Sequence, residues 1–202
     1  LDMALSPDGI KMAVSYMRVN GNKISTHIAF YNFGSAGQME LNNQVGELNV
    51  DDVLAPQIFF CDNSTAVAVR TDGFTVFSGS QSPKEKKTVK FDQEIISTFH
   101  DGNRIGFVFD GGDSGHKYLM KVYNTGGKNT MQKYFDLQYN SITLQKDKIV
   151  LFNEKEFAIY KLNGQKTFQG KYRKPIQNVL SIRGFRKYMV ITEDSADLIR
   201  LG

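Results

Sequence analysis

The amino-acid sequence predicts an all-β protein, and specifically a β-propeller of four-stranded antiparallel blades. No window of about 11 residues or more carries an apolar stripe at i, i+3, i+4 and i+7, which would indicate an amphipathic helix. Short apolar runs recur instead, and glycine, asparagine, aspartate, serine or proline separates them. The runs form groups that begin near residues 1, 57, 95, 141 and 178. This spacing is centred on the roughly 40–45 residues of a propeller blade.

The clearest signal lies at the amino-terminal end, where two alternating apolar runs flank a turn. Leu1-Met3-Leu5 and Met12-Val14-Tyr16 lie on either side of Ser6-Pro7-Asp8-Gly9. Proline fixes its own φ and glycine accepts the positive φ that closes such a turn, so this stretch predicts a hairpin. The first unit, about residues 1–50, has four expected strands: Leu1–Leu5, Lys11–Val19, His27–Phe33 and Val45–Val50.

The second unit, about residues 51–92, has three internal boundaries: Asp62-Asn63-Ser64, Thr71-Asp72-Gly73 and Gln81–Lys87. Asp72-Gly73 between two apolar runs predicts a two-residue hairpin turn. The charged segment Gln81–Lys87 is expected to be a loop. The four expected strands are Gln57–Cys61, Thr65–Arg70, Phe74–Gly79 and Thr88–Phe91.

Three further units repeat the pattern over about residues 93–137, 138–175 and 176–202. Asn163-Gly164 is a candidate type I′ turn in the fourth unit, and the fifth has three expected strands and no fourth. The third unit has Ile95–Phe99, Arg104–Asp110, Lys117–Tyr123 and Met131–Leu137; the fourth has Ser141–Leu144, Lys148–Phe152, Phe157–Leu162 and Thr167–Tyr172; the fifth has Asn178–Ile182, Tyr188–Thr192 and Asp197–Leu201.

The connections favour a propeller over a β-sandwich. A sandwich needs long crossovers between its sheets, whereas nearly every connection expected here is a short hairpin. Thin sheets must stack on one another to bury both faces. We therefore expect residues 1–202 to be a single propeller domain or the carboxy-terminal portion of a larger ring. Closure as a five-bladed ring and pairing with a second chain are the alternatives.

Composition and charge restrict the class of protein. Apolar residues make up 41% and aromatic residues 12%, which is typical of a globular domain. Residues 1–116 have a formal charge of −5, and residues 117–202 have +9. A basic half is compatible with an anionic partner or with a solvated lysine-rich surface. The single cysteine, Cys61, is expected to be a small buried apolar residue. The sequence contains no signal peptide and no apolar run long enough to span a membrane.

The segment from Phe109 to His116 contains the most suggestive polar residues. Gly112-Asp113-Ser114-Gly115 matches the four residues around the nucleophile of chymotrypsin-like proteases, but the residues that follow depart from that signature. Asp110, Asp113 and Ser114 are weak calcium candidates, because calcium prefers several oxygen ligands. Their spacing does not match an EF-hand loop, so a turn without metal is the favoured interpretation.

Other chemistry-bearing patterns are scarce. No dinucleotide-binding or Walker-type glycine loop follows an expected strand, and no pair of carboxylates indicates a glycosidase. We therefore predict no catalytic residues, no cofactor and no structural metal. A basic, aromatic stretch near the carboxy-terminal end gives weak candidates for binding an anionic ligand. These candidates are Arg173, Lys174, Arg183 and Arg186.

The segment Leu5–Ser15 resembles the S-P-D-G repeat of TolB-like and WD-like β-propellers. In those blades the motif forms the turn between the first and second strands. The whole chain, and Val14–Tyr16 through Ala29–Gly34 in particular, is similar to the propeller part of an uncharacterised family from Gram-positive bacteria. That resemblance implies an amino-terminal membrane anchor outside this sequence and a place at the cell surface. It brings no catalytic residues.

Two functions from different classes follow. The first is a non-enzymatic module that binds a protein or a cell-envelope ligand through its loops, in preference to nucleic acid, with self-association of an incomplete ring as a further possibility. The second is a hydrolase or lyase whose polar residues meet in the propeller channel from several blades. The resemblance implies an extracytoplasmic, membrane-anchored protein in both cases.

Overall fold

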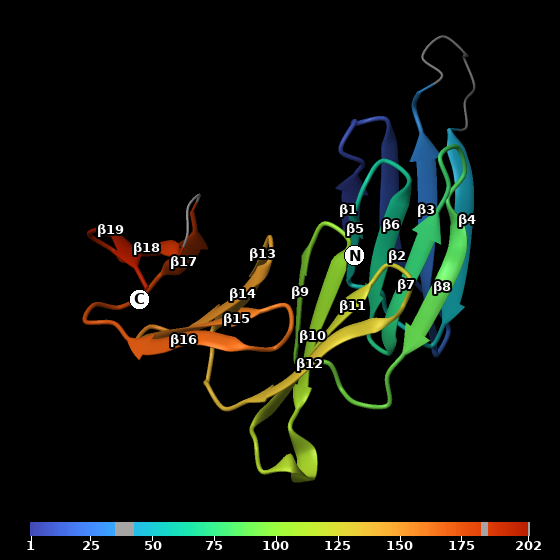
Figure 1. Cartoon of the computed structure of the whole chain (residues 1–202). Coiled ribbons are helices and arrows are strands. Elements are labelled where there is room, and N and C mark those ends of the chain that lie inside the picture. The colour runs from blue at the N-terminus through green and yellow to red at the C-terminus, as the bar shows by residue number, and fades with distance from the viewer. Residues whose placement is uncertain (35–42, 183–185, 202) are drawn as a thin grey trace. The chain divides into compact units, whose positions relative to one another are not determined.

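The structure is a computed structural model that describes residues 1–34, 43–182 and 186–201. These residues form nineteen β-strands in five antiparallel sheets, with one 3-10 turn at Gly112–Ser114 (Figure 1). Four sheets have four strands in sequential order, and the fifth has three. The predicted fold of four blades and a partial fifth is therefore confirmed. Within the described residues, no helix has the length and apolar character needed to cross a membrane.

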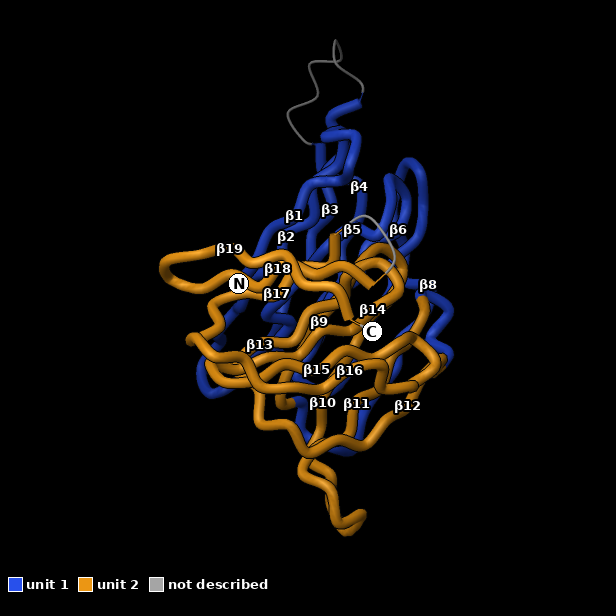
Figure 2. Tube along the Cα trace, turned by 60° about the vertical axis from the view of Figure 1, so that its left-hand side comes forward, with its two compact units in different colours: residues 1–95, 125–128 blue, residues 96–124, 129–202 orange. Residues whose placement is uncertain are grey.

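The chain divides into two compact units (Figure 2). Unit 1 comprises Leu1–Ile95 and Thr125–Lys128, and it holds the first two sheets. Unit 2 comprises Ile96–Asn124 and Asn129–Gly202, and it holds the other three.

The two sheets of unit 1 pack through alternate residues of their inner strands. Ile28 and Phe30 of the first sheet meet Ile58 and Phe77 of the second, and the rings of Phe30 and Phe77 have centroids 4.8 Å apart. The first sheet consists of β1 (Asp2–Leu5), β2 (Lys11–Asn20), β3 (Lys23–Asn32) and β4 (Gln44–Asp51); the second consists of β5 (Gln57–Phe60), β6 (Thr65–Arg70), β7 (Gly73–Ser78) and β8 (Lys84–Lys90).

Unit 2 shows why some strands have continuous apolar sequences. Leu151 packs into the core with the third sheet, while its neighbour Val150 packs into the core with the fifth sheet. Both faces of β14 are therefore buried. The third sheet consists of β9 (Ser97–Asp101), β10 (Arg104–Asp110), β11 (Tyr118–Asn124) and β12 (Asn129–Phe135); the fourth of β13 (Ser141–Gln145), β14 (Lys148–Phe152), β15 (Glu156–Lys161) and β16 (Lys166–Lys171); the fifth of β17 (Asn178–Ser181), β18 (Lys187–Ile191) and β19 (Ala196–Arg200).

The first predicted turn is present between β1 and β2. The Gly9 amide donates to the Ser6 carbonyl at 2.8 Å, and Gly9 has a φ of +71°. The Ser6 hydroxyl contacts the Asp8 carboxylate at 2.5 Å and accepts from the Lys11 amide at 2.9 Å. Side-chain and backbone bonds together close the reversal, as expected for serine and aspartate in a turn.

The expected charged loop over Gln81–Lys87 is wrong, because β8 begins at Lys84 rather than at Thr88. β8 is the outer strand of its sheet, and most of its side chains are exposed. Lysine on such an edge discourages pairing with another sheet, so charge does not exclude a strand there. Cys61, expected to be buried, is only partly buried, and burial raises the pKa of its thiol to about 12.

Two predicted turns have a different geometry. The two-residue turn between β6 and β7 is Thr71-Asp72, because Gly73 already pairs with Arg70. Asn163-Gly164 is not a type I′ turn, which would require a positive φ at both residues. Only Gly164 has one, and its amide donates to the Lys161 carbonyl, which gives a three-residue loop.

Each complete sheet has a register shift where its third strand pairs with its outer strand. In unit 2 the extra residues are Thr130 and Thr167, and each donates its hydroxyl to a third-strand carbonyl at 3.1 Å. Such bulges bend an edge strand and increase its twist. They therefore help to keep the outer edges from pairing with other sheets.

Candidate anion-binding site

A cavity of about 540 Å³ lies in unit 2, where hairpin ends of the fourth and fifth sheets meet. The turn between β13 and β14, the loop between β15 and β16, the facing ends of β17 and β18, and Leu201 after β19 form its walls. We call it the basic cavity; its lining residues are Lys146, Asp147, Lys148, Lys161, Gln165, Lys166, Thr167, Ser181, Ile182, Arg186, Lys187, Tyr188 and Leu201.

The charge of the basic cavity is strongly unbalanced. Six of its lining residues are lysine or arginine, and only Asp147 is acidic. Asp147 is 2.5 Å from the Lys148 ammonium, and the hydrogen bond from Lys148 lowers the pKa of this carboxyl group. The cavity therefore carries one neutralised pair and an excess of positive charge, which attracts anions.

Two of these ammonium groups have neutral partners. Lys161 donates to the Gln165 side chain at 2.9 Å, and Lys166 donates to the Gln169 side chain at 2.8 Å. An amide oxygen fixes the position of an ammonium group without cancelling its charge. Both cations are exposed, so an incoming anion displaces little protein structure.

One part of the wall is less polar. Tyr188 is 3% exposed, and Ile182 and Leu201 are partly buried beside the cavity. Burial raises the pKa of the Tyr188 hydroxyl, and the nearby Asp147 carboxylate raises it further. Tyr188 therefore stays neutral at physiological pH and adds no negative charge to the site.

Gln145 joins the two sheets that form the cavity. Its side-chain nitrogen donates to the Val179 carbonyl at 2.9 Å, and its side-chain oxygen accepts from the Ser181 amide at 2.5 Å. The same nitrogen also contacts the Thr143 hydroxyl. These bonds tie β17 to β13, so the walls around the cavity have a fixed spacing.

The structure separates the anion-binding candidates of the sequence analysis. Arg186 lines the basic cavity, whereas Arg183 lies outside the described residues. Lys174 donates to the Asp194 carboxylate at 3.0 and 3.1 Å. Arg173 borders a different, shallow depression beside β19.

Sequence reasoning missed the five lysines of the basic cavity. Their common feature is position, since they lie in or beside hairpin turns of neighbouring blades: Lys146, Lys148, Lys161, Lys166 and Lys187. Equivalent turns of successive blades lie at the same end of a propeller. A comparison of the turn residues of successive repeats would therefore have indicated that these lysines lie close together.

The calcium candidates serve the loop that contains them. Asp110 accepts from the Gly112 amide at 2.8 Å, and Ser114 accepts from the His116 amide at 3.2 Å. Asp113 is exposed within the 3-10 turn. In the parts of the chain that the structure describes, no group of three or more acidic, histidine or cysteine residues could hold a metal ion. The interpretation of this segment as a turn without metal stays a prediction.

His116 forms a pair with a carboxylate that the sequence did not indicate. Its Nδ1 lies 2.9 Å from Asp136, and both residues line a cavity of about 390 Å³ with Tyr160 and Glu156. Ser114 contacts the His116 backbone amide rather than its ring. This arrangement is not the protease triad, in which the serine hydroxyl donates to the imidazole.

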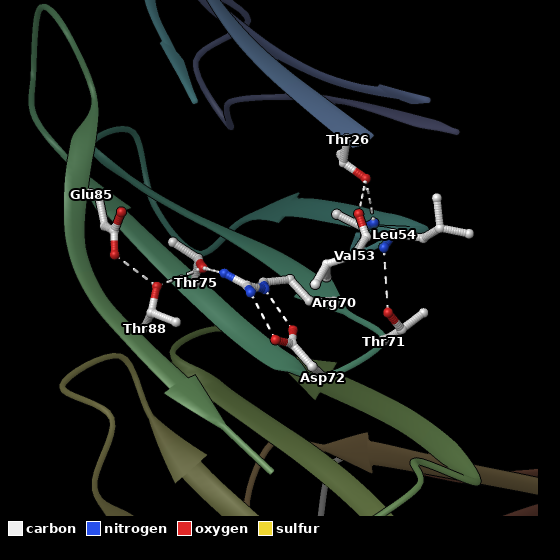
Figure 3. Close-up of polar contacts among 10 residues, drawn as sticks. Thr26, Val53, Leu54, Arg70, Thr71, Asp72, Thr75, Glu85 and Thr88 are labelled. Carbon is white, nitrogen blue, oxygen red and sulfur yellow. Dashed lines mark hydrogen bonds and ion pairs between the residues drawn. The ribbon is translucent and has the colours of Figure 1, made fainter. Parts of the chain in front are cut away.

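Unit 1 contains a second polar cluster around Arg70, which is 6% exposed (Figure 3). Two guanidinium nitrogens donate to Asp72 at 2.7 and 2.8 Å, and a third donates to Thr75 at 3.3 Å. The Thr75 hydroxyl is hydrogen-bonded to the Thr88 hydroxyl, which donates to the Glu85 carboxylate. The guanidinium is thus engaged within its own sheet, so we assign this cluster a structural role.

The sheets and their order define the class of protein as a WD40-like β-propeller, and solved structures agree. Hsv2 from Kluyvelomyces marxianus has a TM-score of 0.58 at 10% identity, covering 98% of this chain and 71% of that chain. BamB from Moraxella catarrhalis has a TM-score of 0.52 at 9% identity, and the match covers 98% of this chain and 72% of BamB. Sqt1 from Saccharomyces cerevisiae has a TM-score of 0.53 at 11% identity, and the match covers 91% of this chain and 56% of Sqt1. At these identities the likeness concerns the fold alone.

The chain belongs to the family of unknown function DUF5711, whose sequence profile matches residues 1–201. No curated protein matches the chain in sequence.

Proposed function

We propose that this protein is a non-enzymatic interaction module that binds an anionic group, on a partner protein or a cell-envelope ligand, through the basic cavity. The excess of cationic residues over the single carboxylate Asp147 supports the proposal. Loops on a rigid sheet scaffold are common binding sites, and the bonds of Gln145 hold this one together.

We also propose that the full-length protein is at the bacterial cell surface through a membrane anchor outside these residues. The support is the resemblance to a membrane-anchored family from Gram-positive bacteria. A surface-exposed basic cavity is compatible with that location, because anionic polymers and lipid headgroups are abundant targets there. Nucleic acid is the less favoured partner.

A hydrolase or lyase is the second candidate function. The observation that favours it is the pair formed by His116 and Asp136 beside Glu156 in one cavity. An imidazole held by a carboxylate is the arrangement of a general base. The binding function is better supported, because the His116 and Asp136 side chains are 47% and 58% exposed and catalytic groups are usually enclosed.

The binding proposal is tested by calorimetry with dextran sulfate as the anionic probe and neutral dextran as its control. The double variant Lys161→Gln/Lys166→Gln removes two cavity charges. Two exposed ionic contacts contribute up to about 1–2 kcal/mol together, so we expect binding to weaken roughly 5–30-fold.

The matched control is Lys84→Gln/Lys86→Gln on the exposed strand β8 of unit 1, which makes the same change in net charge. We expect this variant to bind within about twofold of the unmodified chain. Equal losses in both variants, or no loss in either, would show that the basic cavity is not the site.

A further inference from the structure

Lys146 has a backbone conformation that lysine rarely adopts. It is the first residue of the two-residue turn Lys146-Asp147 between β13 and β14, and its φ is +58°. Over the described ranges, only three non-glycine residues have a positive φ: Asp52, Lys146 and Arg186. The two cations of this group both line the basic cavity.

Two other two-residue turns of the chain place glycine at this position. Gly102 begins the turn between β9 and β10 with a φ of +54°, and Gly21 begins the turn between β2 and β3 with a φ of +62°. In each case only the first turn residue has a positive φ, which is the glycine-favouring pattern of a type II′ turn. Lysine at position 146 is therefore strained where glycine would not be.

Two residues of the third sheet hold this strained turn in place. The Asp101 carboxylate accepts from the Lys146 amide at 2.7 Å, and the Arg104 guanidinium donates to the Lys146 carbonyl at 3.3 Å. Both polar groups of the Lys146 backbone are thus fixed. A disfavoured conformation persists where surrounding contacts determine it, and such positions concentrate at functional sites.

We infer that the basic cavity binds a multiply charged phosphate group, such as a diphosphate, and that Lys146 is a determinant of its affinity. This inference rests on the proposed function. A single carboxylate has one charge to set against Lys146, Lys161, Lys166 and Lys187, whereas a diphosphate brings several negative charges into the same cavity. Ammonium groups are effective point-charge partners for phosphate.

The affinity test is calorimetry with inorganic pyrophosphate, orthophosphate and acetate. We expect the unmodified chain to bind pyrophosphate at least about tenfold more tightly than acetate, with orthophosphate between them. The variant Lys146→Gly should bind pyrophosphate about 3–10-fold more weakly. Adenosine diphosphate distinguishes the two sources of the group: tighter binding than pyrophosphate indicates a diphosphate carried on an organic moiety.

The stability test separates this role from a merely structural one. Because glycine relieves the strain, we expect Lys146→Gly to raise the melting temperature by roughly 2–4 °C while affinity falls. The matched control is Gly21→Lys in unit 1, where a side chain would meet nothing within 4 Å. It should lower the melting temperature and leave pyrophosphate binding within about twofold.

The results distinguish this inference from the proposed function. If Lys161→Gln/Lys166→Gln weakens dextran sulfate binding but Lys146→Gly binds pyrophosphate as the unmodified chain does, the role of Lys146 is overturned and the binding function stands. Equal affinity for pyrophosphate and acetate overturns the phosphate assignment in the same way. If neither polyanion nor pyrophosphate binds, both proposals fall.

Discussion

Ser6 shows how a single side chain can fix a hairpin. It is 4% exposed, and its hydroxyl serves both the Asp8 carboxylate and the buried Lys11 amide. The hydrogen bond from Ser6 is the largest cause of the lowered pKa of Asp8, and a bond from the Ile10 amide lowers it further. The turn therefore depends on the serine as much as on Pro7 and Gly9.

We predict that Ser6→Ala raises the pKa of Asp8 toward its ordinary value of 3.8 and lowers the free energy of unfolding by about 1–2 kcal/mol, because the Lys11 amide loses its side-chain partner. A carboxyl group whose pKa is lowered in the folded state stabilises the fold at pH values above its ordinary pKa. This stabilisation disappears as the pH falls through the folded-state pKa. The variant should therefore lose less of its stability on acidification. Carboxyl titration by NMR and urea unfolding at several pH values measure both effects, and an unchanged Asp8 pKa would contradict this account.

At the scale of elements, the outer strands β8 and β16 are the least hydrophobic strands of their sheets. β8 is rich in lysine, and each of the four complete sheets has a bulge along its outer strand. Charge and bulges both prevent pairing of exposed edges, so these strands contribute to solubility more than to the core. This explains why hydrophobicity located the inner strands more accurately than the outer ones.

The inner strand β6 ends at Arg70, which forms an ion pair with Asp72 in the following turn. We predict that Asp72→Ala lowers the free energy of unfolding by about 3 kcal/mol, because it leaves the buried Arg70 guanidinium without its counter-ion. Asp194→Ala, which removes the partner of the partly exposed Lys174, should lower the free energy of unfolding much less. Urea unfolding of both variants makes the comparison. Equal losses would mean that burial does not govern the strength of these pairs.

At the scale of the whole molecule, the fifth sheet stands apart because it has three strands. Val179, Tyr188 and Val190 on one face are buried in the core with the fourth sheet. The other face carries a row of apolar residues across paired strands, in which Leu180 is 37% exposed and Leu198 is 61% exposed. Exposed apolar rows of this kind favour association.

We predict that this chain self-associates through that face, and that Leu198→Lys shifts sedimentation velocity profiles toward the monomer. Ile96→Lys is the matched control, since Ile96 is 48% exposed but lies outside any strand. We expect this second variant to associate as the unmodified chain does. A chain that is monomeric at all concentrations would refute the prediction.

The fold could be predicted largely from local patterns. The bounds of Thr65–Arg70, Arg104–Asp110 and Lys148–Phe152 were predicted to the residue. Each of these strands lies inside its sheet, where apolar side chains are required on both faces. β8 was cut short in the prediction, because an exposed edge strand accepts charged residues and its hydrophobic signal is weak.

The candidate site was much less predictable. Arg186 could be suggested from its basic surroundings, but Lys146 is separated from it by forty positions in a different repeat. The strain at Lys146 is also invisible in the sequence, since a two-residue turn of lysine and aspartate carries no glycine signal.

The sequence by itself determined the strands, their order and the hairpins that join them, because alternation and turn residues act over a few neighbouring positions. Only the tertiary structure decided which turns lie together, which cations keep uncompensated charge, and which face of the fifth sheet stays exposed. These properties depend on how one sheet packs against the next. That packing brings together residues whose separation along the chain carries no information about their distance in space.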